Sequence, residues 1–235
     1  MATLRKHILR AVTAAAILTA VLAVTLFPIR STEPLHSESY SSGIFCRRLH
    51  NVKLTGDART DIVNVAMSQI GYCEGDSKSE LSGCFAGTKN YTEYGLWYNQ
   101  LQEEPGGYER AMWCASFVSW CANQAQIPSD IVYYHAYTVY GVNWFIQQGQ
   151  AFTRQQVADG EYLPKPGDIV YFKSSRNGDK VNHVGIVVKY EAGILYAVEG
   201  NTNDTSYSTN GGQVCLKSYS ITDEFIRYIC CPNYT

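Results

Sequence analysis

The pattern of apolar and polar positions divides the chain into a helical part and a later part with strand-like runs. Apolar residues recur at helical spacing over residues 57–70, 111–126 and 137–148. After residue 166, short β-branched and aromatic runs alternate with Gly- and Asn-rich turns, at residues 168–172, 181–190, 194–199, 214–221 and 225–231. Helices followed by strands, rather than alternating with them, predict an α+β fold with an antiparallel sheet.

An apolar run precedes all of these elements. Residues 11–27 are interrupted only by three threonines, and Arg5, Lys6 and Arg10 precede the run without any acidic residue. We therefore expect a signal peptide or signal anchor within residues 1–30, with a transmembrane segment at 11–29. The length of the run and the lack of an A-x-A site favour an uncleaved anchor. By the positive-inside rule, everything after residue 30 lies outside the cytoplasm, so the protein is either anchored to the cell membrane or secreted.

The region between this run and the first predicted helix differs in composition. Residues 31–56 are rich in serine and lack periodicity, which predicts an extracellular stalk or linker. Residues 57–235 then form one domain. Without residues 1–30 the chain keeps 15 Lys and Arg against 21 Asp and Glu, a formal net charge of -6.

Composition and motifs exclude several classes of function. With 46% hydrophobic and 17% charged residues and a net charge of -2, the chain is typical of a folded protein and has no basic excess for binding nucleic acid. Phosphate-binding glycine loops are absent, so no nucleotide is expected. C-x-x-C and H-E-x-x-H are absent too, so we expect neither a metal nor another cofactor.

Cys114 is the candidate nucleophile. It falls within the first turn of the predicted helix 111–126, where free backbone N–H groups and the helix dipole favour the thiolate. A buried or disulfide-bonded cysteine is the alternative. Cys121, two turns later, is expected to be a buried, inert thiol rather than a resolving cysteine.

A thiolate nucleophile requires a base that can also protonate the leaving amine. The chain has five histidines, of which His7, His36 and His50 precede the predicted domain. His183 begins a β-branched run and is followed by Gly185, which permits close approach of another side chain. His135, in a polar and aromatic connection, is better explained as a loop residue.

Glu199 and Asn201 are candidates for the group that orients the imidazole. They are two residues apart on the next predicted strand, and therefore on one face of it. A hairpin centred near residue 192 places position 183 opposite about position 201, so either side chain can meet His183. An exposed glutamate at the end of a strand is the alternative for Glu199.

Four separated motifs resemble the CHAP domain, the cysteine, histidine-dependent amidohydrolase/peptidase family of the papain-like NlpC/P60 group. They are AMWCASFVSWCANQAQI, KPGDIVYF, VNHVGIVV and LYAVEGN, and upstream DIVNVAMSQIGYCEG and NYTEYGLWYN resemble the first helix and aromatic loop of CHAP proteins from Gram-positive bacteria. The resemblance covers about residues 57–235. It implies a papain-like fold with N-terminal helices on a five- to six-stranded antiparallel sheet, and catalytic roles for Cys114, His183, Glu199 and Asn201.

The resemblance also implies a substrate, peptidoglycan, cut either between muramic acid and L-Ala or within the peptide. EGDSKSE lacks the repeated acids by which some relatives bind calcium, so no calcium site is expected. Two alternatives remain, a peptidoglycan-binding or scaffolding module on the same fold and a papain-like acyltransferase. Nothing in the sequence selects the bond that is cut.

Two further sets of residues carry expectations. Aromatic side chains flank the predicted cleft and are candidates for stacking on substrate: Tyr91, Tyr94, Trp97, Tyr98 and Trp113. Six cysteines besides Cys114 and Cys121 are candidates for disulfides outside the cell. Cys73 and Cys84 bracket a polar loop and are the first choice for a bond.

Overall fold

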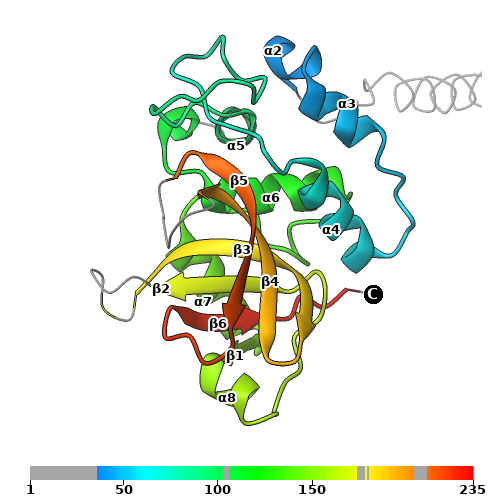
Figure 1. Cartoon of the computed structure of the whole chain (residues 1–235), viewed down its shortest axis with the longest axis vertical. Helices are drawn as coiled ribbons and strands as arrows, with labels where there is room; N and C mark the ends of the chain where they lie inside the picture. Colours follow the sequence, from blue (N-terminus) through cyan, green and yellow to red (C-terminus); the bar gives the residue numbers. More distant parts are fainter. Residues whose placement is uncertain (1–35, 103–105, 174–177, 179, 204–210, 235) are drawn as a thin grey trace, which may run out of the picture. The chain divides into compact units, whose positions relative to one another are not determined.

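The computed structural model describes residues 36–102, 106–173, 178, 180–203 and 211–234 (Figure 1). The chain divides into two compact units, residues 1–33 and 34–235, and all of the described residues belong to the second unit. The predicted signal segment with its transmembrane stretch at 11–29 lies outside the described residues. Within the described part of the chain, no helix has the length and apolar character needed to cross a membrane.

A six-stranded antiparallel sheet forms the lower half of the domain in Figure 1. Its strand order is β1-β6-β2-β3-β4-β5. The strands are β1 (Ala151–Thr153), β2 (Ile169–Lys173), β3 (Val181–Glu191), β4 (Ile194–Thr202), β5 (Gln213–Ser220) and β6 (Ile226–Cys230). Five of these agree with the predicted runs within a few residues, which confirms the α+β class. The three-residue β1 was missed because it is too short to show alternation.

Helices form the upper part of the domain in Figure 1 and also lie beside and below the sheet. They are α4 (Ala58–Ser68), α5 (Glu93–Leu101), α6 (Cys114–Gln124), α7 (Thr138–Gln147) and α8 (Arg154–Ala158), together with the short 3₁₀ helix η1 (Tyr108–Arg110). Side-chain caps explain several of the starts, since Asp57 accepts a hydrogen bond from Thr60 N and Thr92 accepts one from Gly95 N. Three of the helices were predicted from periodicity. Helix α5 falls in the segment that resembled an aromatic loop, and its aromatic residues concealed the helix.

Helix α6 is the centre of the fold. All of its residues from Cys114 to Ala122 are buried. It contacts helices α4 and α5 and strands β3 and β4. Such a helix has no polar face and is stabilised by packing on every side. Gln126, in the left-handed conformation with φ 58°, ends the helical path before Pro128. Cys114, the first residue of α6, belongs to the same core cluster as Val184 and Ile186 of β3.

The predicted stalk over residues 31–56 is wrong for most of its length. Residues Glu38–Ser41 form α2 and Ile44–His50 form α3, and Tyr40, Phe45 and Leu49 are buried in the same core as α6. Their apolar residues are too few and too closely spaced for a recognisable period, because each helix has at most two turns. These residues belong to the folded domain.

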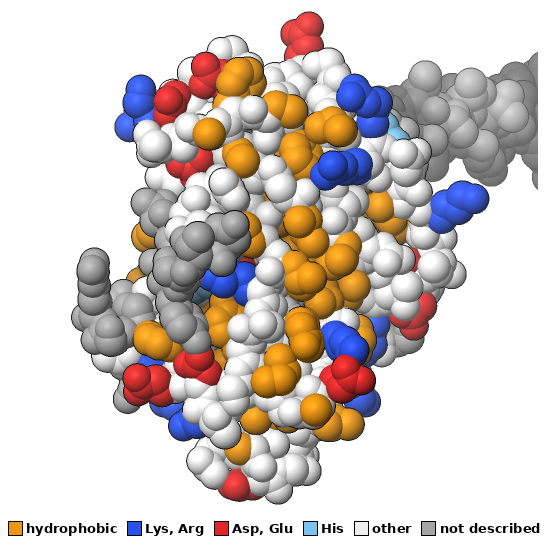
Figure 2. All heavy atoms as spheres, in the orientation of Figure 1, with side chains coloured by type: hydrophobic (Ala, Val, Ile, Leu, Met, Phe, Trp, Pro, Cys, Tyr) orange, Lys and Arg blue, Asp and Glu red, His pale blue; other side chains and the backbone are white. Residues whose placement is uncertain are grey.

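Charged side chains of both signs are interspersed on the face shown in Figure 2. Lys and Arg side chains on that face are separated by acidic and uncharged ones, and no continuous basic surface is formed there. This arrangement agrees with the balance of charge in the sequence.

Candidate active site

Cys114 is the first residue of α6, with only 4% of its surface exposed. The residue before it, Trp113, is the N-cap and gives no side-chain cap to the helix. The N–H groups of the first turn of a helix have no partners within the helix. The Cys114 thiol therefore lies at the positive end of the helix dipole, beside N–H groups suited to stabilising an oxyanion.

His183 lies near the start of β3 and hydrogen bonds to Glu199 on β4. The distance between His183 Nε2 and Glu199 Oε2 is 2.8 Å, and the two side chains are 4% and 1% exposed. Nδ1, the other ring nitrogen, is buried and has no hydrogen-bond partner of regular geometry among the described residues. Since Glu199 occupies Nε2, Nδ1 is the nitrogen left to exchange a proton with a nearby thiol.

The pKa of His183 is affected by both of its neighbours, Cys114 and Glu199. Burial lowers this pKa, but interactions with Cys114 and with Glu199 outweigh burial and raise it to about 10. The imidazolium form is therefore favoured at neutral pH, held between a carboxylate and a thiol. This is the charge distribution that a thiolate nucleophile requires.

Gly185 makes the contact between His183 and Glu199 sterically feasible. It pairs with Glu199 across β3 and β4, and a Cβ at Gly185 would lie 2.7 Å from Glu199 Cγ. Real Cβ atoms do not approach other heavy atoms so closely, so a larger residue would displace the glutamate. The close approach expected at this glycine is confirmed.

Tyr219 on β5 is a member of the site that sequence reasoning missed. Its hydroxyl donates a 2.7 Å hydrogen bond to Glu199 Oε1, the oxygen that His183 does not use. Burial, followed by the charge of Glu199, raises the pKa of Tyr219, so the phenol keeps its proton and remains a donor. The only available signal was a tyrosine in a strand-like run, and several other tyrosines share it.

Asn201 does not join the orienting hydrogen bonds. A register shift interrupts the pairing of β4 with β5 between Glu199 and Thr202, and Asn201 adopts the left-handed conformation with φ 55°. Its side-chain oxygen accepts a hydrogen bond from Gly212 N at 3.4 Å. The expectation that Glu199 and Asn201 share a strand face fails because the irregularity breaks the two-residue alternation.

The aromatic residues expected to stack on substrate are mostly core residues. Trp113 and Tyr94 are fully buried and Trp97 is 2% exposed, while Tyr98 is half-buried. Tyr94 packs against Trp113 and Trp120, with ring centroids 5.4 Å and 5.0 Å apart. Because the rings are buried in the core, they leave little face for a ligand, so the proposed role in substrate binding is wrong for the three buried residues.

The remaining cysteines give a mixed result. Cys73 and Cys84 are neighbours in an isolated β-bridge, but both are free thiols, so the predicted bond is not present. Cys121 is fully buried, and burial raises its pKa well above the ordinary value. It is the inert core thiol that the sequence indicated.

Outside this site, the described residues include a contact between a cysteine and a histidine within α3, with Cys46 Sγ 3.9 Å from His50 Nδ1. In the described part of the chain, acidic residues, cysteines and histidines form no group able to hold a metal ion. A cavity of about 390 Å³ lies near the C-terminal end of α6, lined by residues including Asp61, Ile127 and Tyr234. Cys114 and His183 do not line it, and it has no nucleophile and base in the required arrangement.

A cysteine at the start of a buried helix and a strand histidine paired with an acid agree with the papain-like arrangement that the resemblance implied. Residues 103–201 match the family model described as the CHAP domain. The match contains Cys114, His183 and Glu199, whereas β5 with Tyr219 lies beyond it. No curated protein and no solved structure gave a significant match.

Proposed function

We propose that this protein is a cysteine hydrolase that cuts an amide bond of peptidoglycan. CHAP domains are in general hydrolases of this kind, acting as amidases or peptidases. The observation that carries the proposal is the buried 2.8 Å hydrogen bond between His183 and Glu199, together with the effect of Cys114 on the pKa of the same imidazole. A histidine with a purely structural role would not need a thiol close enough to affect its pKa.

In the proposed reaction, the Cys114 thiolate attacks the carbonyl carbon of the amide. The tetrahedral oxyanion accepts hydrogen bonds from backbone N–H groups at the start of α6, including that of Cys114. His183 donates a proton to the leaving amine as the carbon–nitrogen bond breaks, which leaves a thioester on Cys114. His183 then removes a proton from water, and the resulting attack releases the acid and restores the thiolate.

Glu199 holds the imidazole in one orientation and stabilises its protonated form. A carboxylate in this position acts without itself being protonated. The side-chain oxygen of Asn201 accepts a hydrogen bond from Gly212 N, and the proposal gives Asn201 no part in this step. The bond cut is either the one between muramic acid and L-Ala or one within the peptide.

Location outside the cytoplasm remains part of the proposal. It depends on the basic residues before the apolar run and on membrane attachment through residues 11–29. A peptidoglycan substrate requires such a location. Attachment can be tested by fractionating cells that express the chain with and without residues 1–30.

The direct test of the activity is release of soluble muropeptides from purified cell walls. Residues 34–235 form the compact unit and are the part to compare with Cys114→Ala and His183→Ala. We expect release by the unaltered domain and a loss of about a thousandfold or more in both variants. Equal release by the Cys114→Ala protein would reject the cysteine mechanism.

Two alternatives predict different results in the same assay. A binding or scaffolding module would sediment with the walls without releasing fragments from any wall type. An acyltransferase would release fragments joined to an added amine, which mass spectrometry distinguishes from free acids. Identification of the new chain ends also tells which bond is cut.

A further inference from the structure

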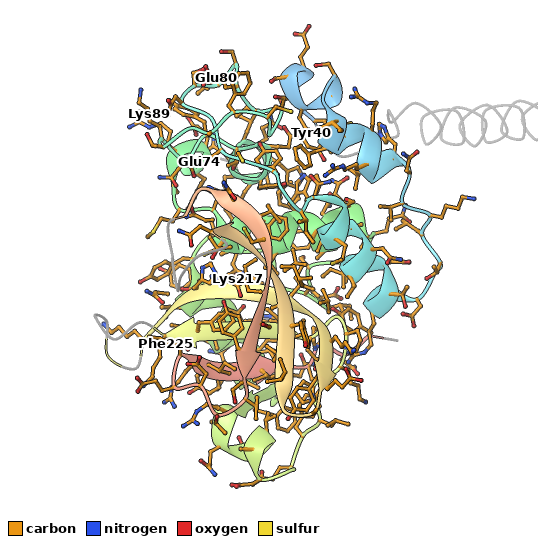
Figure 3. The ribbon with its side chains drawn as sticks, viewed as in Figure 1. Tyr40, Glu74, Glu80, Lys89, Lys217 and Phe225 are labelled. Carbon is orange, nitrogen blue, oxygen red and sulfur yellow. The ribbon has the colours of Figure 1, made fainter. Side chains whose placement is uncertain are left out.

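Glu74 is a buried carboxylate outside the group formed by Cys114, His183 and Glu199. It is 3% exposed and lies on the segment after Tyr72, beside the start of β5 (Figure 3). Within the described residues, no lysine, arginine or histidine forms an ion pair with it. A buried carboxylate without a cation requires hydrogen-bond donors to offset its desolvation.

Each polar group of Glu74 has a partner. Its backbone N–H donates to Gly212 O at 2.9 Å, and its backbone oxygen accepts from Gly87 N at 2.8 Å. Oε1 of the side chain accepts from Asn90 N at 3.1 Å, and Oε2 accepts from Trp113 Nε1 at 2.8 Å. The carboxylate is thus fixed in place by both its backbone and its side chain.

Trp113, the side-chain partner of Glu74, immediately precedes the nucleophile. Its fully buried ring lies 5.4 Å from the ring of Tyr94, and a Cβ at Gly200 would approach its Cζ3 to 2.8 Å. The ring has no room to shift unless the backbone shifts with it. Because Trp113 is the N-cap of α6, such a shift moves Cys114.

We propose that Glu74 is a positioning residue that, through the Trp113 indole, fixes the start of α6 and so the place of the Cys114 thiol beside His183. The role rests on the proposed function and deepens it, since it names a residue on which the reactivity of the nucleophile depends. A misplacement of about 1 Å can cost a hundredfold in rate. A hydrogen bond to a charged, buried acceptor is strong enough to prevent such a displacement.

The test measures the reactivity of Cys114 itself, without any substrate. The full chain is treated with iodoacetamide over a range of pH, and alkylation of the Cys114 peptide is followed by mass spectrometry. We expect Glu74→Ala and Trp113→Phe each to slow alkylation about tenfold at neutral pH. Trp113→Phe keeps an aromatic ring in the core and removes only the donor, so it serves where Glu74→Ala folds poorly.

The double variant gives the sharper result. If both single changes remove the same hydrogen bond, Glu74→Ala combined with Trp113→Phe is no slower than either alone. Glu74→Gln keeps an acceptor oxygen and is expected to retain part of the reactivity. Additive effects, or alkylation at the unaltered rate in every Glu74 variant, would overturn the proposal.

Glu93 provides a matched control for general destabilisation. It is a fully buried glutamate that accepts hydrogen bonds from Ser37 and contacts His36, at the start of α5. Glu93→Gln is expected to lower the melting temperature while leaving alkylation of Cys114 in the folded protein unchanged. An equal loss of Cys114 reactivity in Glu93→Gln would assign Glu74 a structural role only.

The outcome is separate from that of the cell-wall assay. Slower alkylation in the Glu74 variants, with no muropeptides released by the unaltered protein, supports positioning by Glu74 and rejects the proposed substrate. If the unaltered protein releases muropeptides and Cys114 is alkylated at the same rate in the Glu74 variants, the proposed function is supported and positioning by Glu74 is rejected.

Discussion

The Tyr219 hydroxyl donates a 2.7 Å hydrogen bond to the Glu199 oxygen that does not face His183. The glutamate is thus held by one strand on each side, β3 through His183 and β5 through Tyr219. A carboxylate bound at both oxygens has little freedom to rotate, so the imidazole it orients is held as well.

Replacing Tyr219 by phenylalanine should weaken the site without breaking it. The change removes one hydrogen bond to a charged acceptor, worth about 1.5–3 kcal/mol, and should lower kcat/KM by about tenfold or more. We expect most of the loss in kcat, measured from muropeptide release at saturating substrate. Tyr190→Phe on β3, in the same core cluster, is the control and should be close to neutral; equal losses in both variants would contradict the role of Tyr219.

The stability of the protein should fall with rising pH in a way that depends on His183. Because its pKa is raised from an ordinary 6.5 to about 10, the protonated ring stabilises the fold fully below about pH 6.5, and this contribution is lost as the pH rises through 10. Urea unfolding of the unaltered protein and of His183→Gln, from pH 6 to 10, measures the difference. The gap between their free energies of unfolding should narrow as the pH rises. A constant gap would mean that the pKa is not raised.

The activity should have a basic limb controlled by the same group. In the proposed reaction His183 donates a proton to the leaving amine, so kcat/KM should fall as the pH approaches 10. Glu199→Gln removes an interaction that raises the pKa of His183, so its basic limb should move to lower pH and its rate should fall about ten- to a hundredfold. A basic limb at the same pH in both proteins would show that Glu199 does not act on His183.

Substituting alanine for Gly185 should displace Glu199 from His183. The added Cβ would stand 2.7 Å from Glu199 Cγ and 3.1 Å from Val198 O, so the glutamate must move. We expect a loss of activity of about tenfold or more, beyond any effect on stability, which overpacking lowers by about 1–3 kcal/mol. Gly95→Ala in α5, where a Cβ would lie 2.7 Å from Tyr108 O, creates a comparable clash away from Glu199. Activity at temperatures below both melting points separates the two effects.

The N-terminal helices should contribute to stability, contrary to a stalk. Tyr40 is fully buried, and its hydroxyl donates to Gln69 Oε1 at 3.0 Å. Tyr40→Ala should lower the free energy of unfolding by about 3–5 kcal/mol, and Tyr40→Phe by about 1 kcal/mol. Urea denaturation measures both, with the exposed Arg47→Ala as the control. If Tyr40→Ala lowered the free energy of unfolding by less than about 0.5 kcal/mol, as is usual for a surface substitution, the interpretation of residues 31–56 as a stalk would be correct.

Much of the site follows from the sequence because its members occupy recognisable local positions. Cys114 stands where a helical period begins, and His183 and Glu199 lie in β-branched runs joined by a short turn, so their pairing follows from the register of a hairpin. Antiparallel neighbours that are close in sequence meet in only a few ways. The α+β class and five of the six strands follow from the same short-range periodicity.

What the sequence left open depends on contacts between distant segments. It offered both Glu199 and Asn201 as partners of His183, and the irregularity that turns Asn201 toward Gly212 selects the glutamate. Tyr219 reaches Glu199, and Glu74 reaches Trp113, from separate segments of the chain. The local periodicity of a sequence does not predict contacts between distant segments.

Which aromatic side chains are buried also depends on contacts between distant segments. An aromatic residue such as Trp113 has the same chemistry in a groove and in a core, and Tyr40 lies in a stretch too short to show a period. Local pattern in the sequence by itself indicated Cys114 and His183 as candidates and left Glu199 and Asn201 as alternatives for the third group. Only tertiary structure decided what holds them in place, because that depends on which surfaces the packed helices and strands exclude from water.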